Sequence, residues 1–323
     1  MIDDNSVSVI IPTHNHGQYL AEAIKSVLNQ TILPLEIYVV DDGSTDDTKF
    51  VASQFPQVHY IFQLHKGNQT PARAINAALP LAKGRFIVVL GADDILASCY
   101  LEKCLAEFNR PDVGIVFTGC QEFEASTKLR IPRKFHHRLS VFCEPQRQLG
   151  SMMVRRQVYF GAQPEDCANL FEPTEFSNTY LIFLEYASTM PEGVGGYDET
   201  LEGLEDRDLF IRAGLTGWKI RSIPQALHYA RVDDGKVTAH ADIHDLWQKY
   251  PLMKSYAFAS RCFDAGISFL RSPSIFIKRL YNKGVRLLFP KLSVLPEKET
   301  KSTLKFLVND DLWIDAEKLQ VAK

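Results

Sequence analysis

The sequence predicts an α/β protein built on a doubly wound, mostly parallel β-sheet with helices on both faces. Short apolar, β-branched runs such as residues 7–11 and 36–40 alternate with segments of helical periodicity through the first 120 residues. These runs are continuously apolar rather than alternating, which is typical of strands covered on both faces. Regular strand–helix alternation at this spacing favours a parallel sheet.

Each expected element follows from its local pattern. Apolar residues recur every three or four positions between Leu20 and Leu28, as on one face of a helix. Ser44 and Asp47 form a candidate capping box for the next helix. The expected strands are 7–11, 36–40, 58–62, 86–90 and 113–118, and the expected helices are 18–30, 45–55, 71–82 and 98–109, with a further helix at 205–215.

Composition excludes several classes of protein. Of 323 residues, 46% are hydrophobic and 23% are charged, an ordinary globular balance, and the net charge of −3 gives no general attraction to nucleic acid. The six cysteines include no Cys-x-x-Cys pair, which argues against a zinc ribbon or a dithiol redox motif. The first residues are acidic rather than basic and no apolar run approaches the ~20 residues of a membrane span, so we expect a cytoplasmic protein.

Polar residues follow three of the expected strands. Residues 12–15 (Pro-Thr-His-Asn) follow the first, Asp41 and Asp42 the second, and Asp93 and Asp94 the fourth. Ligands bind at the carboxyl ends of such strands, where these side chains would converge. No glycine-rich or Walker turn is present to hold phosphates, so a bound nucleotide would need a cation, and carboxylates suit Mg²⁺ or Mn²⁺. Taken alone, each acidic pair is more typical of an ordinary turn before a helix than of a ligand site.

The helix at 205–215 carries a candidate general base. Asp206 shares a face with the apolar residues three, four and seven positions later, which places it at the end of a buried stripe. Glu205, Asp208 and Arg212 fall on another face, which we expect to be wetter. The alternative is that these acids stabilise the helix N-terminus through its dipole.

Three motifs, taken together and in this order, resemble family 2 glycosyltransferases of the GT-A fold. They are residues 7–15 (Val-Ser-Val-Ile-Ile-Pro-Thr-His-Asn), residues 39–46 (Val-Val-Asp-Asp-Gly-Ser-Thr-Asp), and Gly-Gly-Tyr-Asp-Glu at 195–199 followed by Glu-Asp-Arg-Asp-Leu at 205–209. The resemblance spans roughly residues 6–240. It implies a transferase domain at 1–240, with a nucleotide-binding half at 6–120 and an acceptor and catalytic half at 121–240, before a helical C-terminal extension at 241–323.

The resemblance implies an inverting glycosyltransferase. Such an enzyme moves a sugar from a nucleotide-diphosphate donor, with UDP favoured over dTDP or GDP, to a hydroxyl of a glycan or lipid-linked acceptor, and it uses Mn²⁺ or Mg²⁺. By motif position, the implied roles are nucleobase and donor binding for Pro12, Thr13, Asn15, Asp42 and Asp41, ribose or metal binding for Asp93, metal binding for Asp94, and catalysis by Asp206 as general base. Further candidates near the acceptor or in accessory roles are Glu205, Gly196, Tyr197, His228 and Arg231.

Three positions depart from the family pattern. Gly91 stands where many relatives carry the first acid of the metal motif. Ile75 precedes Asn76 where relatives often carry Arg, and Arg73 is a candidate replacement as a donor contact. The Tyr-Arg-x-His stretch after the base helix is absent, although His228 lies close to that position. These departures motivate an alternative, a non-catalytic glycan-binding or scaffolding protein. A sugar nucleotidyltransferase is disfavoured because no glycine-rich, arginine-containing loop follows the first strand.

The C-terminal region suggests a peripheral membrane contact. Residues 271–291 carry six basic residues and no acid, and on a helix they form a basic face and an apolar face. This segment could dock at the inner face of the plasma membrane or pack its apolar face on the catalytic domain. The aromatic residues between 150 and 195 favour the core of a small insertion over an acceptor platform, and a homo-oligomer is left open.

Overall fold

The computed structural model describes residues 5–67, 70–124, 151–163, 191–201 and 203–232, together with residues 245, 248 and 249. The chain divides into two compact units, Met1–Asp242 and Ile243–Lys323, and every element below belongs to the first. The basic segment at 271–291 and most of the stretch at 150–195 lie outside the described residues. The proposed domain functions therefore stay predictions.

The described elements comprise eight strands, six α-helices and a short 3₁₀ turn. The strands are β1 (Val7–Thr13), β2 (Glu36–Asp41), β3 (Val58–Phe62), β4 (Phe86–Val89), β5 (Ile95–Leu96), β6 (Val113–Glu124), β7 (Met152–Arg155) and β8 (Lys219–Val232). The helices are α1 (Gly17–Leu28), α2 (Thr48–Ser53), α3 (Ala72–Ala78), α4 (Tyr100–Ala106), α5 (Arg156–Phe160) and α7 (Glu205–Leu215), and the 3₁₀ turn is Leu79–Leu81.

All eight strands form one sheet in the order β3-β2-β1-β4-β7-β6-β8-β5. The pairs β1–β2, β1–β4, β2–β3 and β6–β8 are parallel. β7 runs antiparallel to both β4 and β6, and β5 runs antiparallel to β8. The predicted α/β fold with a mostly parallel sheet is confirmed. β5, β7 and β8 were not expected from the sequence.

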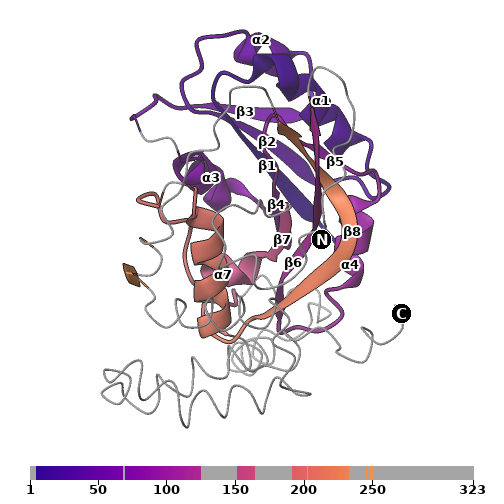
Figure 1. Cartoon of the computed structure of the whole chain (residues 1–323), viewed down its shortest axis with the longest axis vertical. Helices are drawn as coiled ribbons and strands as arrows, with labels where there is room; N and C mark the ends of the chain where they lie inside the picture. Colours follow the sequence, from indigo (N-terminus) through magenta and orange to yellow (C-terminus); the bar gives the residue numbers. More distant parts are fainter. Residues whose placement is uncertain are drawn as a thin grey trace, which may run out of the picture. The chain divides into compact units, whose positions relative to one another are not determined.

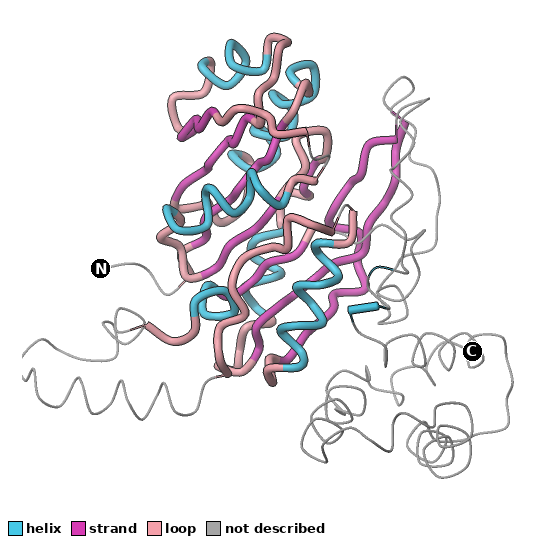
Figure 2. Tube along the Cα trace, turned by 90° about the vertical axis from the view of Figure 1, so that its left-hand side faces the viewer, coloured by secondary structure: helices cyan, strands magenta, loops and turns pink. Residues whose placement is uncertain are grey.

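Helices cover both faces of the sheet, as predicted. Figure 1 shows α1 and α4 on one side and α3 and α7 on the other, and in the turned view of Figure 2 helices again lie against a central layer of strands. On β1, Val7, Val9 and Ile11 are fully buried in the same apolar cluster as Leu20 and Ile24 of α1. Because side chains alternate across a strand, the residues between them face the opposite side, where α3 contacts β1 and β2. Burial on both faces explains why these strands are continuously apolar.

The second helix starts later than predicted, and the capping box expected there is wrong. α2 begins at Thr48, and Asp47 at its N-cap makes no capping side-chain hydrogen bond. Instead the backbone N–H of Thr48 donates to Asp46 Oδ1 over 3.0 Å. Ser44 Oγ accepts a hydrogen bond from the backbone N–H of Asn15 over 2.8 Å. Ser44 therefore ties the β2–α2 loop to the β1–α1 loop rather than starting a helix.

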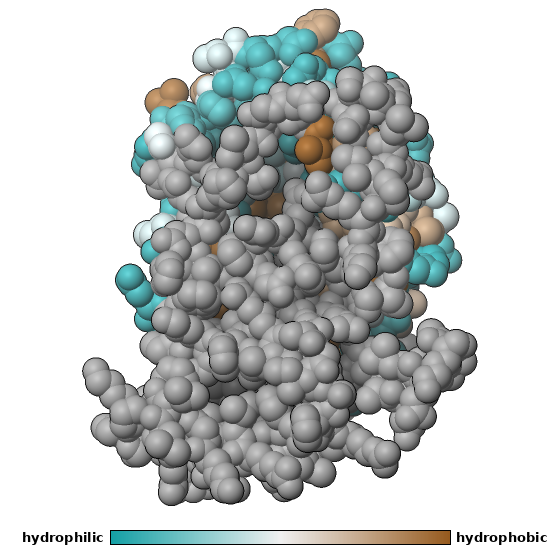
Figure 3. All heavy atoms as spheres, in the orientation of Figure 1, coloured by the Kyte–Doolittle hydropathy of each residue, from teal (hydrophilic) through white to brown (hydrophobic). Residues whose placement is uncertain are grey.

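On the face drawn in Figure 3, the described residues toward the top are mostly hydrophilic, with scattered apolar ones between them. Within the described part of the chain, no helix combines the length and apolar character needed to cross a membrane.

Candidate active site

Three loops meet at one edge of the sheet, where β1, β2 and β4 end. Thr13, the last residue of β1, pairs with Asp41, the last residue of β2. On the other side of β1, the backbone N–H of Leu90 donates to Ile10 O over 3.0 Å as the chain leaves β4. The polar residues that follow these strands therefore leave the sheet from the same edge, as the sequence predicted.

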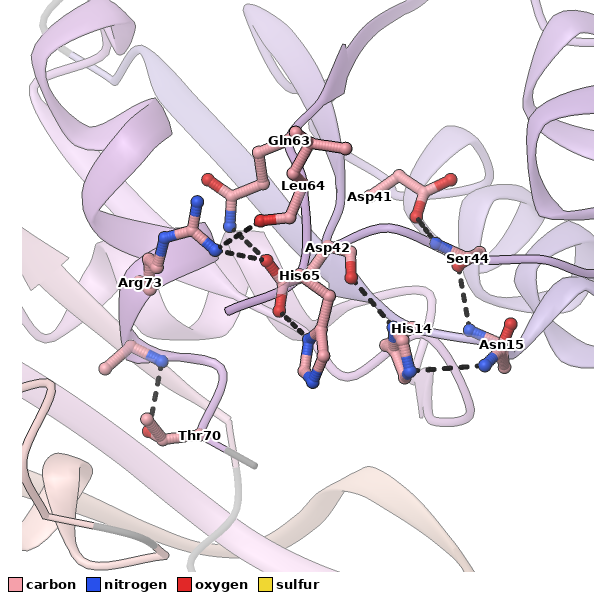
Figure 4. Close-up of polar contacts among 11 residues, drawn as sticks. His14, Asn15, Asp41, Asp42, Ser44, Gln63, Leu64, His65, Thr70 and Arg73 are labelled. Carbon is pink, nitrogen blue, oxygen red and sulfur yellow. Dashed lines mark hydrogen bonds and ion pairs between the residues drawn. The ribbon is translucent and has the colours of Figure 1, made fainter. Parts of the chain in front are cut away.

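Asp42 is the centre of a hydrogen-bonded cluster at this edge (Figure 4). Its Oδ1 accepts from Gln63 Nε2 over 2.6 Å and from Arg73 Nη1 over 3.0 Å, and its Oδ2 accepts from His65 Nδ1 over 2.7 Å. Arg73 Nη1 also donates to the carbonyl oxygen of Leu64 over 2.7 Å. Charge-assisted hydrogen bonds of this kind hold both partners in a defined geometry. The structure thus brings Asp42 and Arg73 together.

Two histidines that sequence reasoning did not single out border Asp42. The rings of His14 and His65 stack with centroids 4.5 Å apart. His14 Nδ1 lies 2.8 Å from the carbonyl oxygen of Asp42, which can only accept, so Nδ1 carries the proton. His14 Nε2 then accepts from Asn15 Nδ2 over 3.2 Å. Only their positions after the first and third strands could have suggested these residues.

The loop after β1 has an unusual backbone conformation at Asn15. Its φ of 55° lies in the left-handed region, which Asn adopts more readily than most residues. Asn15 Oδ1 accepts from the backbone N–H of Thr45 over 2.8 Å. Neighbouring Thr13 is buried, and its Oγ1 has no hydrogen-bond partner among the described residues. The loop is therefore held against the β2–α2 loop, and it contains a buried hydroxyl without a partner among the described residues.

Asp41 plays a structural part in the same loops. It is 1% exposed, and its Oδ1 accepts from the backbone N–H of Ser44 over 2.7 Å. Its Oδ2 accepts from the Tyr60 hydroxyl over 2.6 Å. Burial, together with the hydrogen bond and charge of Asp41, raises the pKa of Tyr60. Both carboxylates are bonded inside the protein, but Asp42 is 9% exposed, so it is the better placed of the pair to face a ligand.

A second acidic group lies in the turn after β4. An added Cβ at Gly91 would lie 3.1 Å from both Asp93 Oδ1 and Asp94 Oδ2, so the two carboxylates converge beside this glycine. Asp94 Oδ2 lies 2.9 Å from Nε2 of the buried His228, and Asp94 Oδ1 accepts from the backbone N–H of Arg231 over 3.0 Å. Burial lowers the pKa of His228, but Cys120 and Asp94 beside it outweigh this effect and raise it to about 10.

Asp94 and His228 are candidate ligands for a divalent cation. Both side chains bind such a cation only when deprotonated. At 2.9 Å, Asp94 Oδ2 and His228 Nε2 share a hydrogen bond, so a bound cation would replace its proton. No group of three or more metal-binding side chains occurs among the described residues. Water and substrate phosphates would complete the coordination, as is usual for Mg²⁺ and related hard cations.

Arg231 fixes the turn that carries these acids. Its Nε donates to the carbonyl oxygen of Asp93 over 2.9 Å, and Nη2 forms an ion pair with Glu22 of α1. The guanidinium carbon lies 4.4 Å from the ring centroid of Tyr19 and 4.6 Å from that of Phe123. The side chain is 4% exposed. Arg231 therefore anchors the acidic turn instead of reaching out toward a ligand.

The third group lies at the start of α7, where Glu205 and Asp206 differ in exposure. Asp206 is partly exposed and its Oδ1 accepts from the backbone N–H of Arg207 over 2.6 Å, whereas Glu205 is 8% exposed. Burial raises the pKa of Asp206. Burial, followed by the charge of Asp206, raises the pKa of Glu205 to about 7. Among the described residues, Asp206 makes no hydrogen bond or ion pair with either of the other two groups.

The predicted wet face of α7 is wrong for Glu205 and Asp208, which are both buried, and Asp206, which was predicted to face inward, is partly exposed. The side chain of Asp208 is completely buried, and its Oδ2 accepts from Arg212 Nε over 2.6 Å. Arg212 in turn donates to the carbonyl oxygens of Val194 and Gly196. The loop that contains Gly196 and Tyr197 therefore covers this face of the helix, which a helical periodicity by itself could not reveal.

Comparison with known proteins identifies a family. A model of the family described as glycosyl transferase family 2 matches residues 8–163. Chondroitin synthase of Escherichia coli is 40% identical over 108 residues, which cover 32% of this chain and 15% of that protein. Glycosyltransferase GlyG of Streptococcus pneumoniae is 32% identical over 124 residues, which cover 37% of this chain and 40% of that protein. The chain thus matches well under half of the length of these two relatives.

Solved structures show the same fold. S. aureus TarS in complex with UDP-GlcNAc has a TM-score of 0.54 at 17% identity, covering 94% of this chain and 79% of that one. The mannosyltransferase PcManGT from Pyrobaculum calidifontis, in complex with GDP-Man and Mn²⁺, has a TM-score of 0.52 at 17% identity, covering 94% of this chain and 87% of that one. At such low identity the likeness supports the fold, and it agrees with the predicted GT-A architecture.

Proposed function

Because this chain belongs to glycosyl transferase family 2, we propose that it is an inverting glycosyltransferase. It moves a sugar from a nucleotide-diphosphate donor, with a UDP-sugar the favoured choice, to a hydroxyl of a glycan or lipid-linked acceptor. The observation that carries the proposal is that the Asp42 cluster and the turn with Asp94 follow strands that end at the same edge of the sheet. The named relatives are polysaccharide synthases and glycosyltransferases, which supports this class of reaction.

The donor's nucleoside would bind in the Asp42 cluster. Asp42 accepts two hydrogen bonds at Oδ1 and one at Oδ2, which leaves Oδ2 capacity for a base N–H or a ribose hydroxyl. Pro12, Thr13 and Asn15 form the adjoining loop, and Asp41 supports it through its hydrogen bond to Ser44, which in turn binds Asn15. Arg73, held by Asp42, supplies a positive charge near the donor. TarS has been solved with UDP and with UDP-GlcNAc and PcManGT with GDP-Man, which supports a nucleotide-sugar donor without selecting one.

Asp94 and His228 would hold Mn²⁺ or Mg²⁺, with Asp93 beside them as a further ligand or ribose contact. The bound cation supplies positive charge to balance the diphosphate. Arg231 keeps the acidic turn in place through its bonds to Asp93 and Asp94. The PcManGT complex contains Mn²⁺, which supports a divalent metal but does not distinguish Mn²⁺ from Mg²⁺.

Asp206 would act as the general base. Its carboxylate takes the proton of the acceptor hydroxyl while the hydroxyl oxygen forms a bond to the anomeric carbon of the sugar. The bond from that carbon to the diphosphate oxygen breaks on the opposite side, and the nucleoside diphosphate leaves with the electron pair. A single in-line displacement inverts the anomeric configuration. Asp206 suits this role better than Glu205 because it is the more exposed of the two.

Calorimetric titration tests the donor site. UDP, dTDP and GDP would each be titrated into the full chain with Mn²⁺ and with EDTA, alongside Asp94→Ala. Asp112→Asn is the matched control, because Asp112 makes a surface ion pair with Arg110. We expect one nucleotide to bind only with Mn²⁺, with binding lost in Asp94→Ala and kept in Asp112→Asn. If no nucleotide binds under either condition, the transferase proposal is wrong.

Of the two observations that motivated the non-catalytic alternative, only the glycine at position 91 still favours it. It was motivated by Gly91 and by the absence of a motif histidine, yet His228 lies 2.9 Å from Asp94. A glycan-binding or scaffolding protein would keep its ligand binding in an Asp206→Asn variant and would show no sugar transfer in either form. Sugar transfer by the wild type would exclude this alternative.

Docking of residues 271–291 on an anionic membrane is proposed from their sequence alone. Sedimentation of the full chain with phosphatidylglycerol vesicles and with neutral phosphatidylcholine vesicles would test it. Binding to the anionic vesicles that weakens at high salt is the expected result.

A further inference from the structure

One peptide group is held between two helices that carry residues of the proposed site. The peptide that joins Gly196 to Tyr197 donates its N–H to Asn76 Oδ1 of α3 over 2.8 Å. Its carbonyl oxygen accepts from Arg212 Nη2 of α7 over 2.9 Å. A backbone peptide is planar and rigid. It therefore fixes the separation between these two side chains.

The side chain of Asn76 makes three hydrogen bonds to this loop. Besides accepting from the backbone N–H of Tyr197, it donates through Nδ2 to the carbonyl oxygen of Tyr197 and to Glu199 Oε1, both over 2.9 Å. The amide thus pairs with both backbone groups of one residue, as a neighbouring strand would. Tyr197 itself is buried and its hydroxyl lies 3.2 Å from that of Tyr159.

The contact accounts for the glycine pair in the Gly-Gly-Tyr-Asp motif. An added Cβ at Gly196 would lie 2.4 Å from Asn76 Oδ1, so no larger residue allows the amide to approach. Gly195 has a φ of 79°, a conformation that only glycine adopts without strain. Gly195 allows the chain to turn, and Gly196 leaves the space that the Asn76 amide occupies.

Arg212 ties the same loop to the helix that carries Asp206. Its Nη1 donates to the carbonyl oxygen of Val194 over 2.6 Å, and its Nε donates to the buried Asp208. Asp208 lies in the first turn of α7, two residues after Asp206. The loop is therefore bonded to the turn of α7 that holds the proposed base.

Helix α3 also connects this loop to the Asp42 cluster. Arg73 and Asn76 lie three residues apart on α3, which places them on neighbouring positions of one helix face. Arg73 binds Asp42, and Asn76 binds the Gly196–Tyr197 peptide. Helix α3 is therefore bonded both to the Asp42 cluster and to the loop, and the loop is bonded to α7 through Arg212.

We propose that Asn76 and Arg212 are positioning residues that hold Asp206 at a fixed position relative to the donor site. This inference rests on the glycosyltransferase function proposed above. It assigns to α3 the task of joining the nucleotide-binding half of the domain to the catalytic half. Misplacing a reacting group by ~1 Å can cost ~10²-fold in rate, so loss of the Asn76 bonds should slow turnover by ~10- to 100-fold. Donor affinity should change by less than about twofold, because Asn76 does not contact Asp42.

The test compares Asn76→Ala and Asn76→Asp with Asn29→Ala, an exposed position at the end of α1. Three quantities are measured on the full chain: Mn²⁺-dependent UDP affinity, the rate of UDP-sugar turnover with water or glycan as acceptor, and hydrogen–deuterium exchange of the peptide that covers α7. We expect faster exchange in α7 and slower turnover in both Asn76 variants, with unchanged UDP affinity. Asn29→Ala should match the wild type in all three.

Asn76→Asp provides a sharper test through Glu199. It keeps the acceptor for the Tyr197 N–H but places a negative charge against the Tyr197 carbonyl oxygen and the Glu199 carboxylate. Adding Glu199→Gln removes one repulsion, so the double variant should recover part of the turnover. A merely structural role for Asn76 would not give recovery of turnover at constant UDP affinity.

Two results would overturn the inference. One is unchanged exchange in α7 of the Asn76 variants, and the other is faster exchange with unchanged turnover. If the wild type binds no nucleotide and transfers no sugar, the proposed function fails instead. The exchange comparison then still decides whether Asn76 orders α7.

Discussion

Glu205 and Asp206 are adjacent acids whose different surroundings give them different chemistry. Glu205 Oε2 is buried and has no hydrogen-bond partner among the described residues, whereas Asp206 is partly exposed. Burial and the neighbouring charge of Asp206 make Glu205 hold its proton more tightly, and they outweigh the backbone hydrogen bonds that favour its ionised form. The two positions could not be separated by residue type, and the pattern of apolar neighbours together with the Glu-Asp motif singled out Asp206.

We expect Asp206→Asn to lower turnover by ~10²- to 10⁴-fold, the range typical of a lost general base. UDP affinity should stay the same, since the amide replaces the carboxylate without a change in shape. Glu205→Gln, the adjacent control, should keep turnover within a few-fold of the wild type. Steady-state rates with a UDP-sugar check both. Equal losses in the two variants would contradict the assignment of the base to Asp206.

The raised pKa of Glu205 predicts how stability depends on pH. Its pKa rises from 4.5 to about 7 on folding, so the folded state binds this proton more tightly than the unfolded state. The resulting contribution to stability is complete below pH 4.5 and is lost as the pH rises through about 7. Glu205→Gln lacks this titration. The free energy of unfolding of the wild type relative to Glu205→Gln should therefore fall between pH 5 and pH 8.

Urea unfolding of both proteins at pH 5, 6, 7 and 8 measures this difference. The slope should not exceed ~1.4 kcal/mol per pH unit, the limit for one proton. A difference that stays constant across this range would show that Glu205 is ionised in the folded protein at pH 5, and the assigned role of burial would be wrong.

At the scale of elements, β6 and β8 depend on a glycine at a break in their register. The pairing of these strands shifts between Val113 and Ile115, and Gly114 lies at the shift. An added Cβ at Gly114 would lie 2.8 Å from both the Trp218 ring and Val158 Cγ2. Trp218 is 1% exposed and donates through Nε1 to the carbonyl oxygen of Glu192 over 3.2 Å. The indole therefore packs directly over the glycine.

We expect Gly114→Ala to destabilise the protein by ~1–3 kcal/mol, the usual cost of overpacking a core. The buried indole and Val158 leave no space for the methyl group, and the strand pair must shift to admit it. Thermal unfolding followed by near-ultraviolet circular dichroism measures this loss of stability. An unchanged melting temperature would mean that this part of the core is loose.

The sequence predicted the elements that are formed by local patterns and missed those formed by distant pairing. The strands that end near Thr13 and Asp41 were found because both of their faces are covered and their residues are therefore continuously apolar. β7 has four residues and acquires its identity by pairing with β4 and β6, which no local pattern reveals.

The same distinction holds for the candidate site. The acids at 42, 94 and 206 were found from motifs, whereas the contact of His228 with Asp94 joins positions 134 residues apart. His228 takes its place through the register of β8, where it pairs with Cys120 of β6 and Leu96 of β5. A lone histidine in a sequence carries no such information, which is why its proximity to Asp94 emerged only from the folded chain.

At the scale of the whole molecule, the proposed metal site joins distant parts of the chain. Asp94 follows β4 and His228 lies on β8, and both belong to the unit Met1–Asp242. A cation held by both residues, together with a nucleotide at Asp42, would bind the folded chain and not the unfolded one. Ligands with this preference stabilise the folded state by RT ln(1 + [L]/Kd), which is ~2.7 kcal/mol at a concentration of ~100 Kd.

We therefore expect UDP with Mn²⁺ to raise the melting temperature of the wild type, and UDP with EDTA to leave it nearly unchanged. His228→Ala should lose the Mn²⁺-dependent part of the increase, because the imidazole is one of the protein ligands proposed for the ion. Asp112→Asn should behave as the wild type, since its carboxylate pairs with Arg110 on the surface. Differential scanning fluorimetry at several UDP concentrations measures all three proteins. An equal increase with Mn²⁺ and with EDTA would show that the nucleotide binds without a cation, and Asp94 and His228 would then have to be regarded as a structural pair.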